Sequence, residues 1–201
     1  MSPQHFVFVH NLKLDLELGV KKNKQHKFVL SPCFQKGRIN LFGGAVATVY
    51  TDANLNIYSE GPDDLQGVGL GVNHKIYMIN GVKENSKHGL YLSYGVSYLN
   101  SKVKYSTYEE EVVVTNDNVS TTLNSVSGID TFKRYGFQTF FGDRILLNKF
   151  ILEGYFGLGY THTNTKSTSP KSRDYDRNIF DYGFTGIHPL MGVKIGFLLT
   201  K

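Results

Sequence analysis

The stretch of sequence that decides the fold is GVGLGVNHKIYM, residues 67–78. Apolar side chains occupy alternate positions from Val68 to Met78, and only His74 interrupts that row. The positions between them hold three glycines, an asparagine, a lysine and a tyrosine. Because successive side chains of a β-strand point to opposite faces, this alternation predicts a strand with one apolar face and one small or charged face.

The same period of two recurs from one end of the chain to the other. Four further segments show it clearly: NLKLDLELGV (11–20), GLYLSYGVSYL (89–99), FILEGYFGLGYT (150–161) and MGVKIGFLL (191–199). Three segments show it more weakly: the short apolar piece QHFVFVH (4–10), KFVLSPCFQ (27–35) and KRYGFQTFFG (133–142). With 201 residues and eight predicted strands, the chain is expected to form one all-β domain over residues 1–201.

The links between these strands alternate between short and long. Short links are predicted at residues 21–26, 80–88 and 143–148, and long ones at 38–65, 100–130 and 164–187. In an up-and-down barrel, alternate links lie at the same end, so one rim carries tight turns and the other carries large loops. This anatomy requires a tight turn at His10-Asn11 and places both termini on the short-turn side.

The long link at residues 100–130 contains a further alternation from Val103 onward, with Glu109-Glu110-Glu111 followed by Val112-Val113-Val114. This pattern predicts strands that continue past the barrel as a protruding sheet. Its exposed edge would be able to pair with a strand of a protein partner. A solvated extension without a partner is the alternative.

The composition of the non-apolar face decides which face looks outward. A soluble barrel has apolar residues inside, whereas a membrane barrel has lipid outside and a polar interior. Here the non-apolar rows hold at least eight glycines. Glycine weakens a solvent-exposed strand, but it fits a lumen that is only just wide enough for side chains. The sequence therefore predicts an eight-stranded antiparallel up-and-down transmembrane β-barrel with short periplasmic turns and long outer loops.

The predicted lumen contains charges of both signs. They are Lys13, Asp15, Glu17, Lys75, Arg134, Glu153 and Lys194. Since a lone buried charge is costly, we expect these groups to pair in an ion-pair network that plugs the barrel. A gated path for protons or ions through that network is the alternative.

The predicted outward rows carry aromatic side chains near strand ends, where membrane barrels place an interfacial girdle. These residues are Tyr94, Tyr98, Tyr135, Phe150 and Tyr160.

Several function classes are disfavoured by composition. The net charge of +5 comes without a basic face interleaved with aromatic residues, so no nucleic-acid partner is expected. The single cysteine, Cys33, excludes a disulfide scaffold and is predicted to be a small buried filler. No apolar run is long enough for a spanning helix, and Met1-Ser2-Pro3-Gln4 does not begin a secretory signal.

No cofactor, metal or catalytic residue is predicted. The seven histidines form no metal-binding motif, and Gly67, Gly69 and Gly71 lack the spacing and the following helix of a dinucleotide site. One catalytic alternative stays open. His162 and His188, if they meet at the long-loop rim beside a Ser or a carboxylate, would suit a lipid-hydrolysing triad.

Four segments carry a family resemblance: NLKLDLELGVKKNKQHKFVLSP (11–32), GVGLGVNHKIY (67–77), FGDRILLNKFILEGYFGLGY (141–160) and GVKIGF (192–197). In these segments, which cover most of the chain outside the long loops, the protein is similar to small outer-membrane β-barrel proteins of the Bacteroidetes type. Those proteins have uncharacterised functions and share the architecture of the OmpA and OmpX barrels.

The resemblance implies an eight-stranded barrel in the outer membrane of a Gram-negative bacterium. It also implies export by a leader peptide, absent from this chain, and insertion by the outer-membrane assembly machinery. Such barrels commonly end on an aromatic residue, whereas this chain ends Leu199-Thr200-Lys201, with Phe197 as its last aromatic residue.

The expected function is non-enzymatic: a structural or surface-interaction role in the outer membrane, with a plugged polar lumen. The expected partners are the lipid bilayer, lipopolysaccharide and a protein that contacts the outer loops. The first alternative is an outer-membrane lipid-modifying enzyme that uses His162 or His188. The second is a soluble lipocalin-like lipid carrier, whose leucine and phenylalanine rows would face an inner cavity.

Overall fold

The computed structural model describes residues 9–20, 23–39, 49–51, 57–59, 63–79, 88–115, 118–168 and 182–198. Its strands are β1 (Val9–Lys13), β2 (Leu16–Val20), β3 (Asn23–Ile39), β4 (Val49–Thr51), β5 (Ile57–Ser59), β6 (Asp63–Ile79), β7 (His88–Thr115), β8 (Asn118–Leu147), β9 (Phe150–Ser167) and β10 (Gly186–Phe197). Among the described residues, no helix has the length and apolar character needed to cross a membrane.

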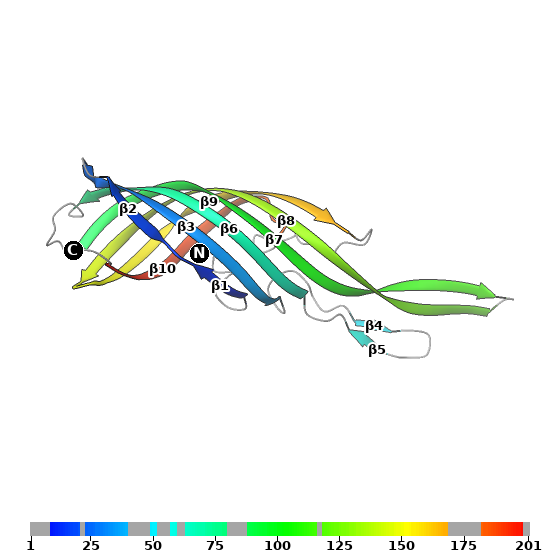
Figure 1. Cartoon of the computed structure of the whole chain (residues 1–201). Coiled ribbons are helices and arrows are strands. Elements are labelled where there is room, and N and C mark those ends of the chain that lie inside the picture. The colour runs from blue at the N-terminus through cyan, green and yellow to red at the C-terminus, as the bar shows by residue number, and fades with distance from the viewer. Residues whose placement is uncertain are drawn as a thin grey trace.

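Eight of the ten strands form one antiparallel sheet, and the prediction of an all-β antiparallel fold is confirmed (Figure 1). Neighbours in the sheet follow one another along the chain, in the order β1/β2, β3, β6, β7, β8, β9 and β10. β4 and β5 form a separate two-stranded hairpin within the long connection between β3 and β6.

β1 and β2 are one strand with a short interruption. Both pair with β3 in the same register, with Val9 opposite Gly37 and Leu16 opposite Leu30. The interruption lies opposite Pro32, which accepts a hydrogen bond of 3.1 Å from the backbone N–H of Leu14. Proline has no N–H with which to return that bond, so the ladder is interrupted at this point.

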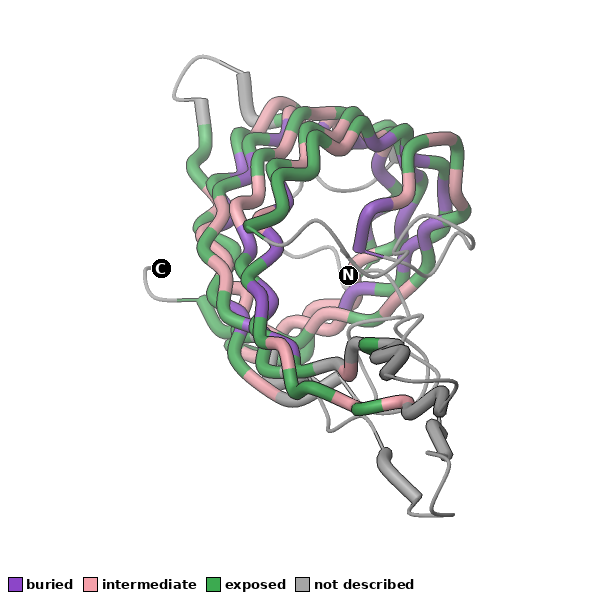
Figure 2. Tube along the Cα trace, turned by 90° about the vertical axis from the view of Figure 1, so that its right-hand side faces the viewer, coloured by how far each residue is buried: buried purple, intermediate pink, exposed green. Residues whose placement is uncertain are grey.

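The sheet is consequently seven strand positions wide, and the closed eight-stranded barrel is not formed among the described residues. Each strand runs antiparallel to its neighbour, so the two edges, β1/β2 and β10, run in the same direction. An antiparallel barrel closes with an even number of strands. The described sheet instead curls round a common axis and stays open between its edges (Figure 2).

The predicted turn at His10-Asn11 is wrong, because both residues lie inside β1 and pair with β3. Of the predicted first strand, QHFVFVH, only Val9 and His10 are described, and the other residues lie outside the described part of the chain. The error arose because a short apolar run has no period of its own to mark where a strand begins.

The first described strand begins and the last described strand ends at opposite ends of the sheet, whereas the prediction of both termini on the short-turn side falls on residues outside the described part of the chain. Val9 pairs with Gly37 near the long connection after β3, whereas Phe197 pairs with Phe150 beside the tight turn before β9. With seven strand positions instead of the predicted eight, the first described strand runs in the direction opposite to that predicted for the first strand.

Two links differ in length from their predictions. β8 continues to Leu147 and is joined to β9 by Asn148-Lys149, where Asn148 has a φ of 58°. The segment predicted as a long loop at residues 100–130 is paired at 100–115 and 118–130, because β7 and β8 continue beyond the sheet (Figure 1). The alternation from Val103 onward predicted this extension.

The faces of the sheet have the predicted orientation. Leu14, Leu70 and Val193 point away from the axis and are 50%, 46% and 61% exposed. Lys75 and Glu153 point toward the axis and are 3% and 5% exposed. A lipocalin-like carrier requires the opposite arrangement, in which the apolar rows surround an inner cavity.

Aromatic rings and glycines fill the interior together. Tyr77, Tyr91, Phe140 and Tyr155 form one buried cluster. A Cβ atom added at Gly142 would lie 2.4 Å from Cζ of Tyr91, so only glycine leaves room for that ring. The predicted need for small residues on the inward rows thus has a steric cause, and the bulky neighbours are tyrosines as well as charged side chains.

We predict that Gly142→Ala destabilises the protein by about 1 to 3 kcal/mol, because the added methyl group displaces the Tyr91 ring in a packed interior. Gly154→Ala is the matched control, since a Cβ at Gly154 meets nothing within 4 Å. Urea unfolding in detergent micelles, followed by tyrosine fluorescence, measures both. Equal stability of the two variants would contradict the packing described.

Candidate functional site

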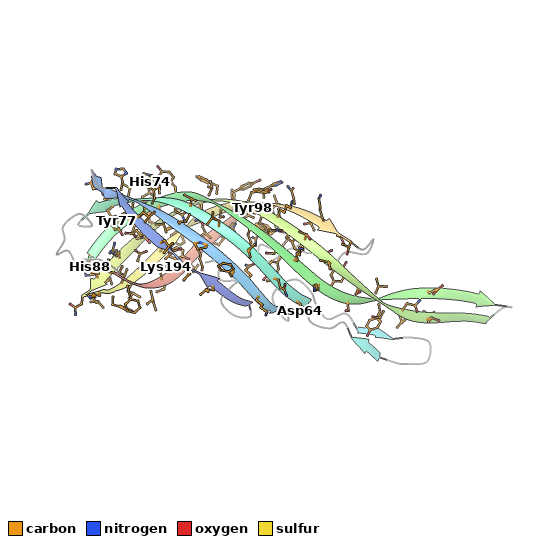
Figure 3. The ribbon with its side chains drawn as sticks, viewed as in Figure 1. Asp64, His74, Tyr77, His88, Tyr98 and Lys194 are labelled. Atoms are coloured by element: carbon orange, nitrogen blue, oxygen red, sulfur yellow. The ribbon has the colours of Figure 1, made fainter. Side chains whose placement is uncertain are left out.

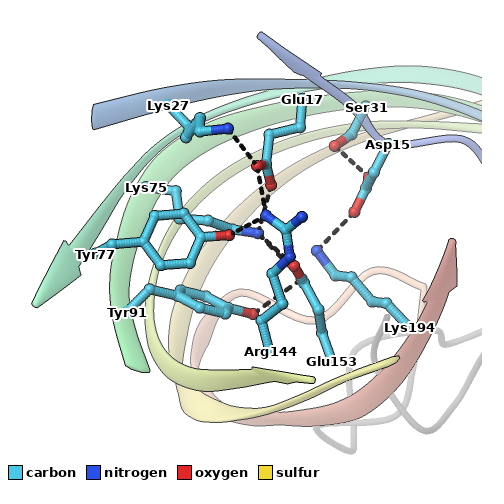
Figure 4. A network of polar contacts seen from close by, with 10 residues as sticks. All are labelled: Asp15, Glu17, Lys27, Ser31, Lys75, Tyr77, Tyr91, Arg144, Glu153 and Lys194. Carbon is cyan, nitrogen blue, oxygen red and sulfur yellow. Dashed lines mark hydrogen bonds and ion pairs between the residues drawn. The ribbon is translucent and has the colours of Figure 1, made fainter. Parts of the chain in front are cut away.

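The centre of the interior is a lysine held between two carboxylates (Figure 4). Lys75, on β6, places Nζ 2.9 Å from Oε2 of Glu17 on β2. The same ammonium group lies 2.8 Å and 3.0 Å from the two carboxylate oxygens of Glu153 on β9. Because these strands are not neighbours in the sheet, the contacts cross the interior and hold its curvature.

Glu17 also binds two further cations. Its Oε1 accepts a hydrogen bond of 3.2 Å from Nη1 of Arg144, on β8, and lies 3.3 Å from Nζ of Lys27, on β3. Arg144 in turn donates to the hydroxyl oxygen of Tyr77 over 2.9 Å. The carboxylate of Glu17 is therefore shared among three strands besides its own.

A second ion pair connects the two open edges of the sheet. Nζ of Lys194, on β10, lies 2.6 Å from Oδ2 of Asp15, which stands between β1 and β2. Ser31, on β3, donates to the other oxygen of Asp15 over 2.5 Å. Side chains thus bridge the edges at a place where no described backbone ladder does (Figure 4).

Aromatic rings surround both ammonium groups. Nζ of Lys75 lies 4.3 Å from the ring centroid of Tyr91, whose hydroxyl donates to Glu153 over 3.2 Å. Nζ of Lys194 lies 5.5 Å from the Phe140 centroid and 5.3 Å from that of Tyr155. These distances suit cation–π attraction, which is strongest where water is excluded.

The carboxylates of this network are all paired with cations. All three of its carboxylates are engaged by cations: Asp15 by Lys194, Glu17 by Lys75, Lys27 and Arg144, and Glu153 by Lys75. Each carboxylate therefore has an opposite charge close by inside the curled sheet, as a charge withdrawn from water requires.

Five of the seven predicted lumen charges meet in these contacts: Asp15, Glu17, Lys75, Glu153 and Lys194. Lys13 lies on the same inward row, within electrostatic reach of Asp15 and Lys194. Arg134 is placed elsewhere. It precedes Arg144 by ten residues on β8, which corresponds to about 33 Å along a strand.

Arg134 belongs to a group near the long connections. Its nearest charged or titratable neighbours include Tyr182 and His188, and its Nε is buried without a hydrogen-bond partner among the described residues. Tyr182 packs on Phe132, with ring centroids 6.4 Å apart. Burial raises the pKa of the Tyr182 phenol to about 12, and the positive charge of Arg134 acts in the opposite direction.

The predicted catalytic alternative finds no assembled partner set in the described part of the chain. His188 has Phe184 as its ring neighbour, with centroids 6.5 Å apart, and it lies beside the backbone of Gly186. His162 is exposed, in register with Tyr135. No cluster of three or more metal-binding side chains occurs in the described residues, and Cys33 lies half-buried on an inward row.

A polar chain that includes His74 lies on the outer face, at the end of the sheet nearer the short links (Figure 3). Nδ1 of His26 and Nε2 of His74 share a hydrogen bond of 2.9 Å, and Nδ1 of His74 bonds the Tyr94 hydroxyl over 2.7 Å. The ring of Phe28 stacks on His74 at 5.0 Å. The polar atoms that join these three strands thus satisfy one another on the outer face, where His88 and Asp143 also lie exposed and 3.6 Å apart.

The predicted interfacial aromatics all lie on outward rows. Tyr94 takes part in the polar chain, and Tyr98 packs against Tyr135 with ring centroids 5.2 Å apart. Phe150 packs edge-on against Phe197 at 5.4 Å, beside the tight turn, and Tyr160 is exposed in register with Ile187 near the long connection. The outward aromatics therefore occur toward both ends of the sheet.

Sequence reasoning missed several members of the interior network. Arg144 falls in a predicted link because the alternation ends β8 too early. Lys27, at the start of a segment with weak alternation, is not among the predicted interior charges. Tyr77, Tyr91 and Tyr155 stand on inward rows that the period of two identifies. Their position was visible in the sequence, but their role as partners of buried charges was not.

No family model, no curated protein and no solved structure matches the chain.

We predict that Lys75→Met lowers the free energy of unfolding by about 3 to 5 kcal/mol, because it leaves Glu17 and Glu153 as like charges without their shared cation. Lys149→Met, in the exposed tight turn, is the control and is expected to change stability little. Urea unfolding measures both variants. In the double variant Lys75→Met/Glu153→Leu, the loss is expected to be smaller, and an equal or larger loss would contradict the proposed coupling.

Proposed function

We propose that this chain is an integral protein of the outer membrane of a Gram-negative bacterium, with a non-enzymatic structural or surface-interaction role. The observation that carries the proposal is the inverted arrangement of the sheet, with charges inside and apolar rows outside. Soluble monomers rarely expose continuous apolar patches larger than a few hundred Å². Lipid hydrocarbon is the environment in which such a surface is stable.

β10 illustrates the scale of the exposed surface. Its outward apolar side chains are each more than half exposed: Ile187, Met191, Val193, Ile195 and Phe197. Full burial of a side chain of this size stabilises by about 1.5 to 3 kcal/mol relative to exposure in water. Transfer of this one strand from water to lipid therefore contributes several kcal/mol, and the outward rows of the neighbouring strands add to it.

The height of the apolar surface also suits a bilayer. From Ile187 to Phe197 an extended strand rises about 34 Å. At the tilt of roughly 40° that is usual for membrane barrels, this length spans about 25 Å, which equals the apolar band of outer-membrane proteins.

Insertion in lipid also requires satisfied backbone edges, because unpaired N–H and C=O groups are costly in hydrocarbon. We therefore propose that the protein in the membrane is a closed eight-stranded barrel, similar to the OmpA and OmpX barrels. β1/β2 and β10 run in the same direction, so a single strand of opposite direction would pair antiparallel with both edges. Such a strand would bring the number of strand positions to eight, and an antiparallel barrel requires an even number.

The proposed partners follow from this placement. The outward rows would contact acyl chains, and the aromatic side chains near the sheet ends would lie at the headgroup level beside lipopolysaccharide or phospholipid. The outer-membrane assembly machinery would insert the chain. The ion-paired interior would exclude solutes, so contacts with other molecules would fall to the segments beyond the sheet.

We predict that a tryptophan on an outward row is quenched by lipids with brominated acyl chains, whereas one on an inward row is not. The chain contains no native tryptophan, so Phe156→Trp (outward) and Phe140→Trp (inward) each report from one position. Fluorescence in vesicles measures the quenching, and a heat-modifiable gel shift verifies folding. Absence of quenching at position 156 in a folded variant would contradict insertion.

We predict that the wild-type protein shows no steady conductance in planar bilayers. The reason is that Glu17, Lys75 and Glu153 meet across the interior and leave no row of free charges for an ion to follow. Protein-free bilayers with the same detergent are the control. Steady conductance of roughly tens of picosiemens would favour the gated ion path instead.

A further inference from the structure

The two longest strands form a ribbon beyond the sheet, which we define as residues 105–115 of β7 and 118–128 of β8. The pairing of β6 with β7 ends at Lys104, and that of β8 with β9 ends at Asp130. From there outward, each strand of the ribbon pairs only with the other among the described residues, from Tyr105↔Gly128 to Thr115↔Asn118 (Figure 1).

The ribbon has two open edges of unusual length. Eleven residues of extended chain cover about 37 Å, and among the described residues no third strand pairs with the outer side of either strand. An isolated two-stranded ribbon is only marginally stable, so a third strand would stabilise it.

Several devices that block edge pairing are missing from the ribbon. Natural edge strands are protected by proline, by charged side chains (lysine above all) or by β-bulges, and the charged residues of the ribbon are acidic. Residues 105–128 contain no proline and no lysine, and the pairing of the ribbon shows no register shift. Valine and threonine, which favour extended structure, are frequent in it. The edges are thus regular and competent to pair.

Side-chain contacts hold the ribbon as an ordered extension of the sheet. Tyr105, at its base, is buried, and its hydroxyl lies 3.5 Å from Oγ of Ser167 at the end of β9. Gly128, opposite Tyr105, leaves room for that ring. Further out, Nδ2 of Asn124 donates to Glu111 over 2.9 Å. A template ordered in advance lowers the entropic cost of adding a strand.

The charge of the ribbon indicates which partner it suits. Residues 105–128 contain four acidic residues and no Lys, Arg or His, although the whole chain has a net charge of +5. Three of the four acidic residues are consecutive in β7, at positions 109–111. Opposite charges on facing strands attract, whereas like charges repel. A basic strand is therefore favoured over an acidic one and over a nucleic acid.

We propose that the edge of β7 in the ribbon binds an extended basic polypeptide segment by β-strand addition, running antiparallel to β7 beside Glu109–Glu111. Backbone hydrogen bonds supply the pairing, and the acidic run selects Lys- or Arg-bearing strands. The inference deepens the surface-interaction role proposed above and rests on it only in that the ribbon projects outside the lipid. Binding by protein in detergent micelles does not depend on membrane insertion.

The first experiment measures fluorescence anisotropy of a labelled ten-residue peptide of alternating Thr and Lys, titrated with the full chain in detergent. Two matched peptides separate pairing from charge: one N-methylated at alternate residues, which keeps the charge but cannot form the ladder, and one with Glu in place of Lys. We expect binding of the first peptide, at least tenfold weaker binding of the second and none of the third. Equal binding of the first two would overturn the proposal.

The second experiment changes the protein. The variant Glu109→Gln/Glu110→Gln/Glu111→Gln keeps the strand and is expected to bind the Thr-Lys peptide at least tenfold more weakly. Joining Lys104 to Ile129 through an Asn-Gly turn removes the ribbon and is expected to abolish binding. Asp143→Asn, at the other end of the sheet, is the control and is expected to leave binding unchanged.

Wild-type affinity in either the triple variant or the ribbon deletion would overturn the proposal. The triple variant keeps the test decisive if the deletion fails to fold. These outcomes are independent of the brominated-lipid measurement. Loss of quenching with retained peptide binding would reject membrane insertion alone, and the reverse would reject the ribbon as a binding edge.

Discussion

The constraint on which the rest of this structure depends is that charges withdrawn from water must find partners of opposite charge. Lys75 is almost completely buried and lies between the carboxylates of Glu17 and Glu153, which come from strands on other parts of the sheet. These contacts are made only if the sheet curls. With the charged rows inside, the period of two directs every apolar row outward, and the unusual outer surface follows.

The edges of the sheet show the same constraint at a larger scale. β1/β2 and β10 run in the same direction and share no described ladder, yet Lys194 reaches Asp15 between them. An ion pair of this kind stabilises the curl without covering the backbone groups of either edge. In water those groups are solvated, whereas in hydrocarbon they need a further strand. The lipid environment proposed for the apolar rows would thus also require the sheet to close into a barrel.

The sequence was sufficient for those features that depend on which face a residue occupies. Alternation at residues 67–78 predicted a strand with Val68, Leu70 and Val72 outward and Lys75 inward, and alternation from Val103 predicted the ribbon. Features that depend on register were not accessible in the same way. That Lys75 meets both Glu17 and Glu153 depends on the stagger of strands far apart in sequence, which a period of two does not encode.

Strand ends were the other source of error, for a related reason. QHFVFVH is short and has no alternation to delimit it, so a turn was placed where β1 in fact continues through His10. The alternation pattern ends β8 before Arg144 and places this residue in a link, so its contact with Glu17 was not predicted. Arg134 was placed with the central charges because the face of a residue says nothing of its height along the strand.

The most direct test of the central claim is methyl NMR of the folded protein in lipid nanodiscs with two paramagnetic agents. The agents are a doxyl-labelled fatty acid in the hydrocarbon and a gadolinium chelate in the water. The account predicts that the fatty acid broadens the methyl signals of Leu14, Leu70 and Val193 and that the chelate leaves them sharp. Broadening of these signals by the chelate, with no effect of the fatty acid, would contradict it.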